Sequence, residues 1–100
     1  MEEIIKNKNG TEVSILNETK LSLKDMQDYV DGYIELVYDD GDIQIVCNEE
    51  GKLMGMLENK EATDLWNDLI EEAEDGLNID AWGDYLVGNV LILKDKARMD

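Results

Sequence analysis

Two short apolar segments on either side of residues 39–42, Asp-Asp-Gly-Asp, constrain the fold more than any other feature. If these four residues form a loop, Tyr38 lies opposite Ile43, and the apolar residues of both segments share one face of a β-hairpin. Those residues are Ile34, Leu36, Tyr38, Ile43, Ile45 and Cys47. A shift of one residue would turn the whole set towards water, so the pattern predicts both the hairpin and its register.

A first hairpin and a short helix are predicted before this central hairpin. Asn9-Gly10 suits the positive φ angles of a tight turn between residues 2–6 and 11–16. Ser22 is placed to cap a helix, and Gly32 is expected to end it in a left-handed conformation. The helical spacing comes from Leu23, Met26 and Val30.

The second half of the chain predicts one long helix and one central strand. Asn59 is expected to cap a helix over residues 60–75 that ends at Gly76. Its buried stripe consists of Ala62, Leu65, Trp66, Leu69, Ile70 and Ala73. Residues 85–93 are apolar at nearly every position, which is typical of a strand covered on both faces. Between the central hairpin and the long helix, residues 53–57 predict an extended segment or a short strand.

Together these elements predict a single two-layer α+β domain over residues 1–100, with a mostly antiparallel sheet and two helices packed on it. The expected order is ββαββ(β)αβ, in which the bracketed strand is the segment 53–57. Residues 77–84, which contain Trp82, are expected to form an irregular loop. The tail from about residue 94 to 100 is expected to be frayed.

The charge balance limits the class of partner. The chain has 9 basic residues, 25 acidic residues and no histidine, which gives a formal net charge of −16. Direct binding to nucleic acid or to an anionic membrane is disfavoured, because both need cations on the protein, and a basic protein partner is expected instead. The N-terminus lacks the basic start and apolar run of a secretory signal, so we expect a cytoplasmic location.

The acidic residues are concentrated in the middle of the chain. Residues 25–84 contain 19 acidic residues and only two basic ones, Lys52 and Lys60. On the predicted long helix, a row of carboxylates lies opposite the buried stripe and consists of Asp64, Asp68, Glu71, Glu72 and Asp75. One hypothesis is that this acidic row imitates a nucleic-acid backbone, since four helical residues rise about 6 Å, comparable to the spacing of phosphates. The other is that the row is a solvated surface that keeps the protein soluble.

A second candidate site lies at the less apolar face of the central hairpin and in the loop that follows. Its residues are Tyr33, Glu35, Asn48, Glu49 and Lys52. We interpret Lys52 and the backbone at Gly51 as a binding site for a small polar ligand such as a nucleotide. A covered sheet face followed by an ordinary turn is the simpler explanation of the same residues.

No motif predicts catalysis, a cofactor or a metal site. Cys47 falls on the predicted core face, and with no histidine to serve as a base it is expected to be a small buried residue. The acidic residues of 39–42 are explained by the turn they occupy. Residues 78–83 match part of the ligand spacing of a calcium-binding loop, but Trp82 stands where an oxygen ligand belongs.

Glycines and polar residues around the central hairpin form a distinctive set. Its members are Gly32-Tyr33-Ile34-Glu35, Val46-Cys47-Asn48-Glu49-Glu50-Gly51-Lys52, Gly55, Asn59, Ala62-Thr63 and Val87-Gly88. In these residues the chain resembles, from about residue 25 to 93, a family of small domains of unknown function found in phages and other mobile elements of bacteria. Family members often have proline ahead of the position of Asn59, whereas this chain has Glu58. The resemblance implies a phage or mobile-element setting in a bacterial cytoplasm and supplies no activity.

These observations lead us to expect a non-enzymatic accessory protein that binds a basic partner through the acidic row. A nucleic-acid mimic that inhibits a host defence protein or a nucleic-acid-handling protein is one form of this expectation. The alternative is a module that binds or sequesters a nucleotide-like ligand on the face of the central hairpin.

Overall fold

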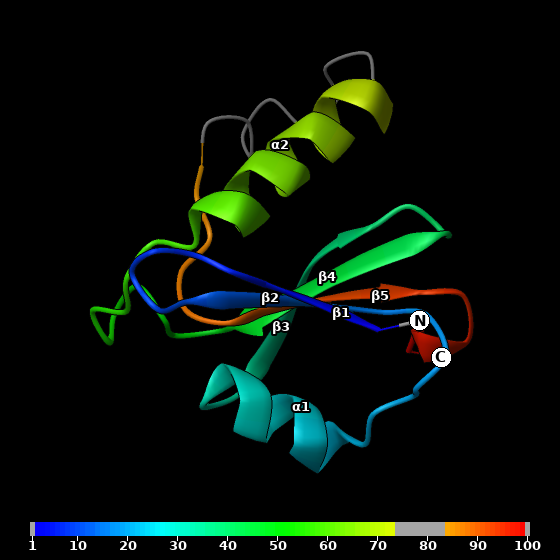
Figure 1. Cartoon of the computed structure of the whole chain (residues 1–100), viewed down its shortest axis with the longest axis horizontal. Coiled ribbons are helices and arrows are strands. Elements are labelled where there is room, and N and C mark those ends of the chain that lie inside the picture. The colour runs from blue at the N-terminus through cyan, green and yellow to red at the C-terminus, as the bar shows by residue number, and fades with distance from the viewer. Residues whose placement is uncertain (1, 74–83, 100) are drawn as a thin grey trace.

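Five strands form one sheet at the centre of the computed structural model, which describes residues 2–73 and 84–99. The strands are β1 (Glu3–Lys6), β2 (Glu12–Leu16), β3 (Ile34–Asp39), β4 (Ile43–Asn48) and β5 (Val90–Lys94). They lie in the order β1-β2-β5-β4-β3, with β2 and β5 parallel and the other pairs antiparallel (Figure 1). The mostly antiparallel sheet and the predicted order of elements are therefore confirmed.

Two helices cover opposite faces of this sheet, as Figure 1 shows. Helix α1 (Leu23–Val30) packs on one face through Met26 and Val30. Helix α2 (Lys60–Ala73) packs on the other face through Trp66 and Ile70. The domain thus has three layers rather than the predicted two. Neither of these described helices has the length and apolar character needed to cross a membrane.

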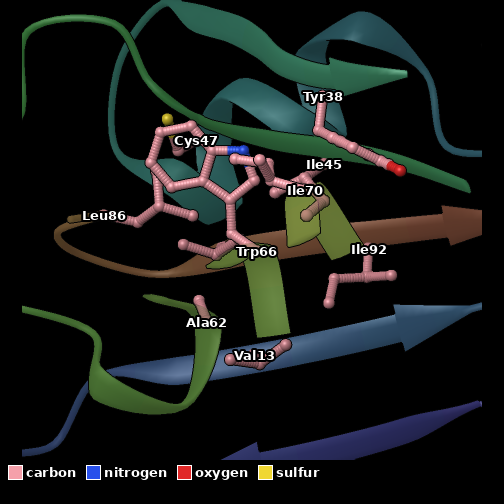
Figure 2. Close-up of a cluster of buried hydrophobic side chains, with 10 residues drawn as sticks. Val13, Tyr38, Ile45, Cys47, Ala62, Trp66, Ile70, Leu86 and Ile92 are labelled. Carbon is pink, nitrogen blue, oxygen red and sulfur yellow. The ribbon is translucent and has the colours of Figure 1, made fainter. Parts of the chain in front are cut away.

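Strand β5 lies between two separate hydrophobic clusters. Val90 and Ile92 belong to the cluster under α2, whereas Leu91 and Leu93 belong to the cluster under α1. Figure 2 shows the cluster under α2, with the indole ring of Trp66 among the other buried side chains. The prediction of a central strand covered on both faces is confirmed, although the strand begins later than expected.

Helix α1 begins as predicted and ends one residue earlier than predicted. The hydroxyl of Ser22 accepts a hydrogen bond of 3.1 Å from the backbone N–H of Asp25. At the other end Asp31, with φ of 65°, takes the left-handed conformation that was expected of Gly32. Gly32 is needed for a different reason, because a Cβ at this position would lie 2.6 Å from Nδ2 of Asn48.

The central hairpin forms, but its predicted register is wrong. Tyr38 pairs with Ile45 rather than with Ile43, and Leu36 pairs with Val46. The register shifts between Leu36 and Tyr38, as expected for a β-bulge that adds one residue to β3. The apolar residues are consequently divided between the two faces of the sheet. Tyr38, Ile45 and Cys47 join the cluster under α2, and Ile34 and Val46 join the cluster under α1.

The segment after β4 differs from the prediction. Residues 49–55 form consecutive turns instead of leading into an extended strand. Leu53 and Met54 are exposed, and regular pairing is limited to one bridge between Glu58 and Val87. Gly55 adopts a φ of 75°, which a glycine reaches without steric cost and which fits a turn and not a strand.

The C-terminal tail is packed rather than frayed over its described residues. A short 3-10 helix covers Asp95–Ala97, and Ala97 is buried in the cluster under α1. The backbone N–H of Met99 donates to Oε1 of Gln44 at 2.6 Å. An apolar contact and a hydrogen bond to β4 therefore hold the tail, and neither was visible in the local sequence.

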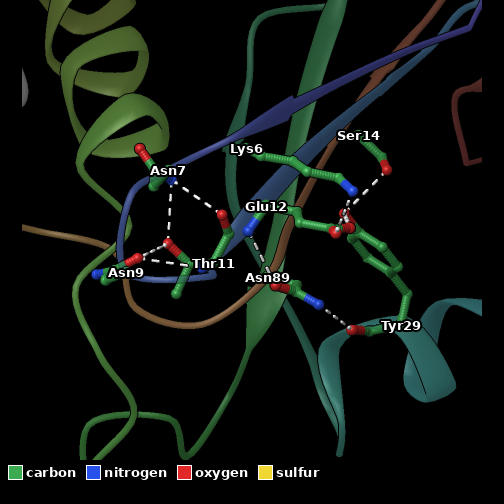
Figure 3. Close-up of polar contacts among 8 residues, drawn as sticks. All are labelled: Lys6, Asn7, Asn9, Thr11, Glu12, Ser14, Tyr29 and Asn89. Atoms are coloured by element: carbon green, nitrogen blue, oxygen red, sulfur yellow. Dashed lines mark hydrogen bonds and ion pairs between the residues drawn. The ribbon is translucent and has the colours of Figure 1, made fainter.

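Polar side chains attach α1 to β2 and to the start of β5 (Figure 3). The hydroxyl of Tyr29 accepts from Oγ of Ser14 at 2.9 Å and donates to Oε1 of Glu12 at 3.2 Å. Burial raises the pKa of Tyr29, so the hydroxyl keeps its proton for this bond. The Asn89 side chain donates to the backbone oxygen of Tyr29 at 3.3 Å and accepts from the backbone N–H of Glu12 at 3.0 Å.

One buried side chain, Asn59, joins α2 to the first hairpin and to the loop before β5. Its Oδ1 accepts from the backbone N–H of Ala62 at 3.1 Å, which caps α2 as predicted, and from Nδ2 of Asn7 at 2.8 Å. Its Nδ2 donates to the backbone oxygens of Glu12 and Gly88, each at 2.8 Å. The amide thus satisfies four groups from four segments and positions α2 on the sheet.

The substitution Asn59→Asp tests this role. The carboxylate keeps the cap but loses both donors and places a negative charge beside two carbonyl oxygens. We expect the free energy of unfolding, measured by urea denaturation at pH 7, to fall by about 2–4 kcal/mol. Asn9→Asp is the matched control: it loses one hydrogen bond, to the backbone oxygen of Glu58, at an exposed position and should cost less than about 1 kcal/mol. Equal losses for the two variants would contradict the role assigned to Asn59.

Candidate functional site

The outer side of α2 carries exposed carboxylates. Burial of Trp66 and Ile70 against the sheet turns the opposite side of the helix to solvent. The described members of the predicted acidic row, Asp64, Asp68, Glu71 and Glu72, are all exposed there. The structure therefore brings these four residues to one solvent-facing surface.

The chain neutralises little of this acidic row. Nζ of Lys60 lies 3.2 Å from Oδ2 of Asp64, an exposed pair one helical turn apart. Such a pair contributes only a few tenths of a kcal/mol, about 0.3–0.5 kcal/mol. Within residues 2–73 and 84–99, the other three described carboxylates of the row make no ion pair. The fifth predicted member, Asp75, lies outside the described residues, as do Gly76 and Trp82.

A shallow cavity of about 360 Å³ lies between the central hairpin, α2 and the loop before β5. Four of the five predicted ligand residues line it, namely Glu35, Asn48, Glu49 and Lys52. Tyr33 borders a neighbouring cavity of about 480 Å³ instead, which Asn48 also lines. Trp66 lines the first cavity, but its Nε1 is shielded from solvent and has no hydrogen-bond partner among the described residues. The indole therefore offers no accessible donor to a bound molecule.

The positive charge in the first cavity is already compensated. Nζ of Lys52 lies 2.6 Å from Oδ1 of Asp84 and 4.3 Å from the centroid of the Tyr85 ring. The hydrogen bond from Lys52 lowers the pKa of Asp84, so this carboxylate remains charged at neutral pH. An anionic ligand would therefore compete with the Asp84 carboxylate for this lysine.

Asn48 holds the end of α1 to the turn after β4. Its Nδ2 donates to the backbone oxygens of Val30 and Asp31, each at 3.0 Å. Its Oδ1 accepts from the backbone N–H of Glu50 at 2.7 Å. Because this buried amide already makes three hydrogen bonds to the backbone, its role is structural, and its role in ligand binding stays a prediction.

The shared face predicted for Glu35 and Asn48 is wrong. Glu35 pairs with Cys47, whereas Asn48 pairs with Ile34, so the two side chains leave the hairpin on opposite faces. Cys47 is buried and free, which confirms the prediction of a small core residue. Burial, with a smaller effect of the Glu35 carboxylate, raises the pKa of Cys47 to about 12, so the thiol stays protonated at neutral pH.

The acidic turn between β3 and β4 uses its carboxylates for its own hydrogen bonds. Oδ1 of Asp40 accepts from the backbone N–H groups of Asp42 and Ile43, each at 2.8 Å. Oδ1 of Asp39 accepts from the backbone N–H of Gly41 at 3.0 Å. Desolvation acts to raise the pKa of Asp40, but the hydrogen bonds outweigh it and the pKa is lowered. These bonds agree with the turn explanation of the cluster.

Two glycines, Gly51 in the turn after β4 and Gly88 in the loop before β5, allow these two segments to pack closely. A Cβ at Gly51 would lie 2.6 Å from Cγ2 of Val87 and 3.3 Å from Sδ of Met56. A Cβ at Gly88 would lie 2.8 Å from the same Sδ. No structural role was predicted for either glycine, although both belong to the set that carried the family resemblance.

Sequence comparison assigns the chain to a family. The model of the family described as Domain of unknown function (DUF3846) matches residues 2–99. The chain therefore belongs to this family, which confirms the resemblance to domains of unknown function and extends it to the first hairpin. No curated protein and no solved structure matches the chain.

A double-mutant cycle on Gly51 and Val87 tests the packing of the turn. We expect Gly51→Ala to lower the free energy of unfolding by about 1–3 kcal/mol, because the new methyl group overlaps Cγ2 of Val87. Val87→Ala removes that atom, so the double variant should lose less stability than the two single losses added together. Additive losses in urea denaturation would contradict the close contact.

Proposed function

We propose that this member of the DUF3846 family is a non-enzymatic interaction protein that binds a basic partner through the acidic row of α2. The observation that carries the proposal is the set of exposed carboxylates on this helix, of which Asp64 alone makes an ion pair in the described part of the chain. Asp68 and Glu72 are one turn apart, and like charges at this spacing destabilise a helix by about 0.2–0.5 kcal/mol per pair. Lysines or arginines of a partner would relieve this repulsion on binding.

A nucleic-acid-handling protein is the class of partner that fits this surface. Such proteins present lysines and arginines spaced to neutralise phosphates. Carboxylates four residues apart on a helix are separated by a rise of about 6 Å, which suits the same cations. The resemblance to domains of phages and mobile elements supports a role in a bacterial cytoplasm, where inhibition of a host defence protein is one outcome of such mimicry.

Charge reversal on α2 tests the proposal. We expect the variant Asp68→Lys, Glu71→Lys and Glu72→Lys to lose a basic protein that the wild type retains from host lysate at low salt. The three positions are exposed, so the fold should persist, which circular dichroism would check. The matched control reverses Glu3, Asp25 and Asp42, three exposed acidic residues elsewhere.

The control has the same change in net charge and should retain the partner. Equal capture by the two reversed variants would contradict a specific role of α2 and favour a surface that only promotes solubility. Retention that does not weaken between low and high salt would contradict the electrostatic basis.

A second candidate function is the binding of a small polar ligand in the cavity beside Lys52. Its volume of about 360 Å³ is the observation in its favour, because small-molecule sites commonly enclose about 300–1,000 Å³. The ion pair of Lys52 with Asp84 and the structural hydrogen bonds of Asn48 count against a nucleotide. We therefore rank this function second.

A thermal-shift screen with nucleotides tests the second function. A nucleotide at 100 times its dissociation constant should stabilise the wild type by about 2.7 kcal/mol, a shift of several degrees. The shift should disappear in Lys52→Ala and persist in Lys60→Ala, which removes an exposed lysine from α2. Absence of any shift in the wild type would reject nucleotide binding.

A further inference from the structure

Exposed apolar side chains gather around the turn after β4. Of the eight large apolar side chains that are exposed in the described residues, five line the two cavities beside this turn, whereas Leu57 lines a different cavity and Ile4 and Leu23 lie elsewhere. These five form what we call the apolar patch, with exposed fractions of 67% for Tyr33, 44% for Leu36, 87% for Leu53, 55% for Met54 and 44% for Tyr85. Figure 1 shows the chain between β4 and α2 looping out beyond the sheet. Apolar side chains gathered in this way on a small protein indicate an interaction surface.

The patch extends over the two cavities. Tyr33 and Met54 line the cavity of about 480 Å³, and Leu36, Leu53 and Tyr85 line the cavity of about 360 Å³. Asn48 lines both, and Leu53 and Met54 are consecutive in the chain. A single partner segment can therefore contact both cavities across the tip of the turn.

The turn that presents the patch is an ordered element. The backbone N–H of Met54 donates to the oxygen of Glu50 at 2.9 Å, and that of Met56 donates to the oxygen of Gly51 at 3.0 Å. Gly51 packs against Val87 without room for a side chain. Hydrogen bonds and packing thus hold Leu53 and Met54 outwards, which reduces the entropy lost when a partner covers them.

Carboxylates surround the apolar patch. The acidic residues that line the two cavities are Asp28, Asp31, Glu35, Glu49, Glu50 and Asp84. Lys52 is the only basic residue among the described lining residues, and it is paired with Asp84. A second copy of the chain would bring like charges together at this surface, and an anionic membrane would be repelled.

We infer that the apolar patch and its surrounding carboxylates form the docking surface for a basic amphipathic segment of a protein partner. Apolar side chains of the segment cover Leu53 and Met54, and its lysines or arginines pair with carboxylates such as Glu49 and Glu50. The inference rests on the proposed function, because it names a second part of the surface that the basic partner contacts. Met54 at the tip of the turn suits a docking surface, because its flexible thioether adapts to different apolar groups.

Titration with defined peptides tests the inference. The probes are a Lys/Leu peptide with helical amphipathic spacing and a Lys/Ser peptide of the same length and charge. Wild-type protein should bind the Lys/Leu peptide at least about tenfold more tightly, because the leucines cover apolar surface. In ¹⁵N-resolved NMR spectra, the amide shifts specific to this peptide should lie at residues 33–36, 49–57 and 84–86.

Two variants separate the patch from the acidic row. The variant Leu53→Ser and Met54→Ser should lose the preference for the Lys/Leu peptide and keep its affinity for the Lys/Ser peptide. The positions are exposed, so the variant should fold. The reversed α2 variant should keep the preference, even though its affinity for both peptides falls.

The inference is overturned if the wild type binds the two basic peptides equally or binds neither. A preference that survives in the serine variant would also overturn it, as would equally tight binding of a Glu/Leu peptide. Failure of the proposed function gives a different result, in which reversal of α2 leaves the affinity for the Lys/Ser peptide unchanged. The two failures are therefore distinguishable in one set of titrations.

Discussion

Strand β5 is the element on which the rest of the structure depends, because its side chains alternate between two hydrophobic clusters. Val90 and Ile92 belong to the cluster under α2, and Leu91 and Leu93 to the cluster under α1, so this one strand contributes to the packing of both helices. Asn59 then fixes α2 relative to the first hairpin and to the approach to β5. Burial of the apolar interior and full hydrogen bonding of this amide leave the outer side of α2 without a structural task.

The negative charge lies on surface that neither the hydrophobic clusters nor the hydrogen bonds of Asn59 use. Of the described ion pairs, those of Lys24 and Lys60 are exposed pairs within one helix, and such pairs contribute little to stability. These two pairs therefore offset little of the formal net charge of −16. A surface that is unfavourable for the isolated protein is favourable for a complex with a basic partner, and this supports a binding role.

Local patterns in the sequence were enough to predict most of the secondary structure. The spacing of apolar residues and the caps at Ser22 and Asn59 predicted both helices, and the run that contains β5 predicted a central strand. The register of the central hairpin was not predictable in this way, because the β-bulge after Leu36 depends on contacts made on both faces of the sheet. The strands β4 and β5 carry buried apolar side chains on both faces, which explains why the sheet has a helix on each face.

The candidate sites were predictable only in part. The exposed acidic row follows directly from helical spacing, and its described members lie where the sequence placed them. The structural use of Asn48 was not visible, since its partners at Val30 and Asp31 are distant in the chain. The apolar patch was missed for a similar reason. Leu53 and Met54 are apolar and suggested burial, but the glycines on either side allow a turn that directs them to solvent.

Site-specific photocrosslinking in host cells tests the central claim most directly. A photocrosslinking amino acid would replace Leu53 in the apolar patch, Asp68 in the acidic row, or Asp42 in the turn between β3 and β4 as a control. Our account predicts that the same basic protein is crosslinked from positions 53 and 68 and not from position 42. Equal crosslinking from all three positions, or crosslinking from 53 and 68 to proteins without a basic surface, would contradict it.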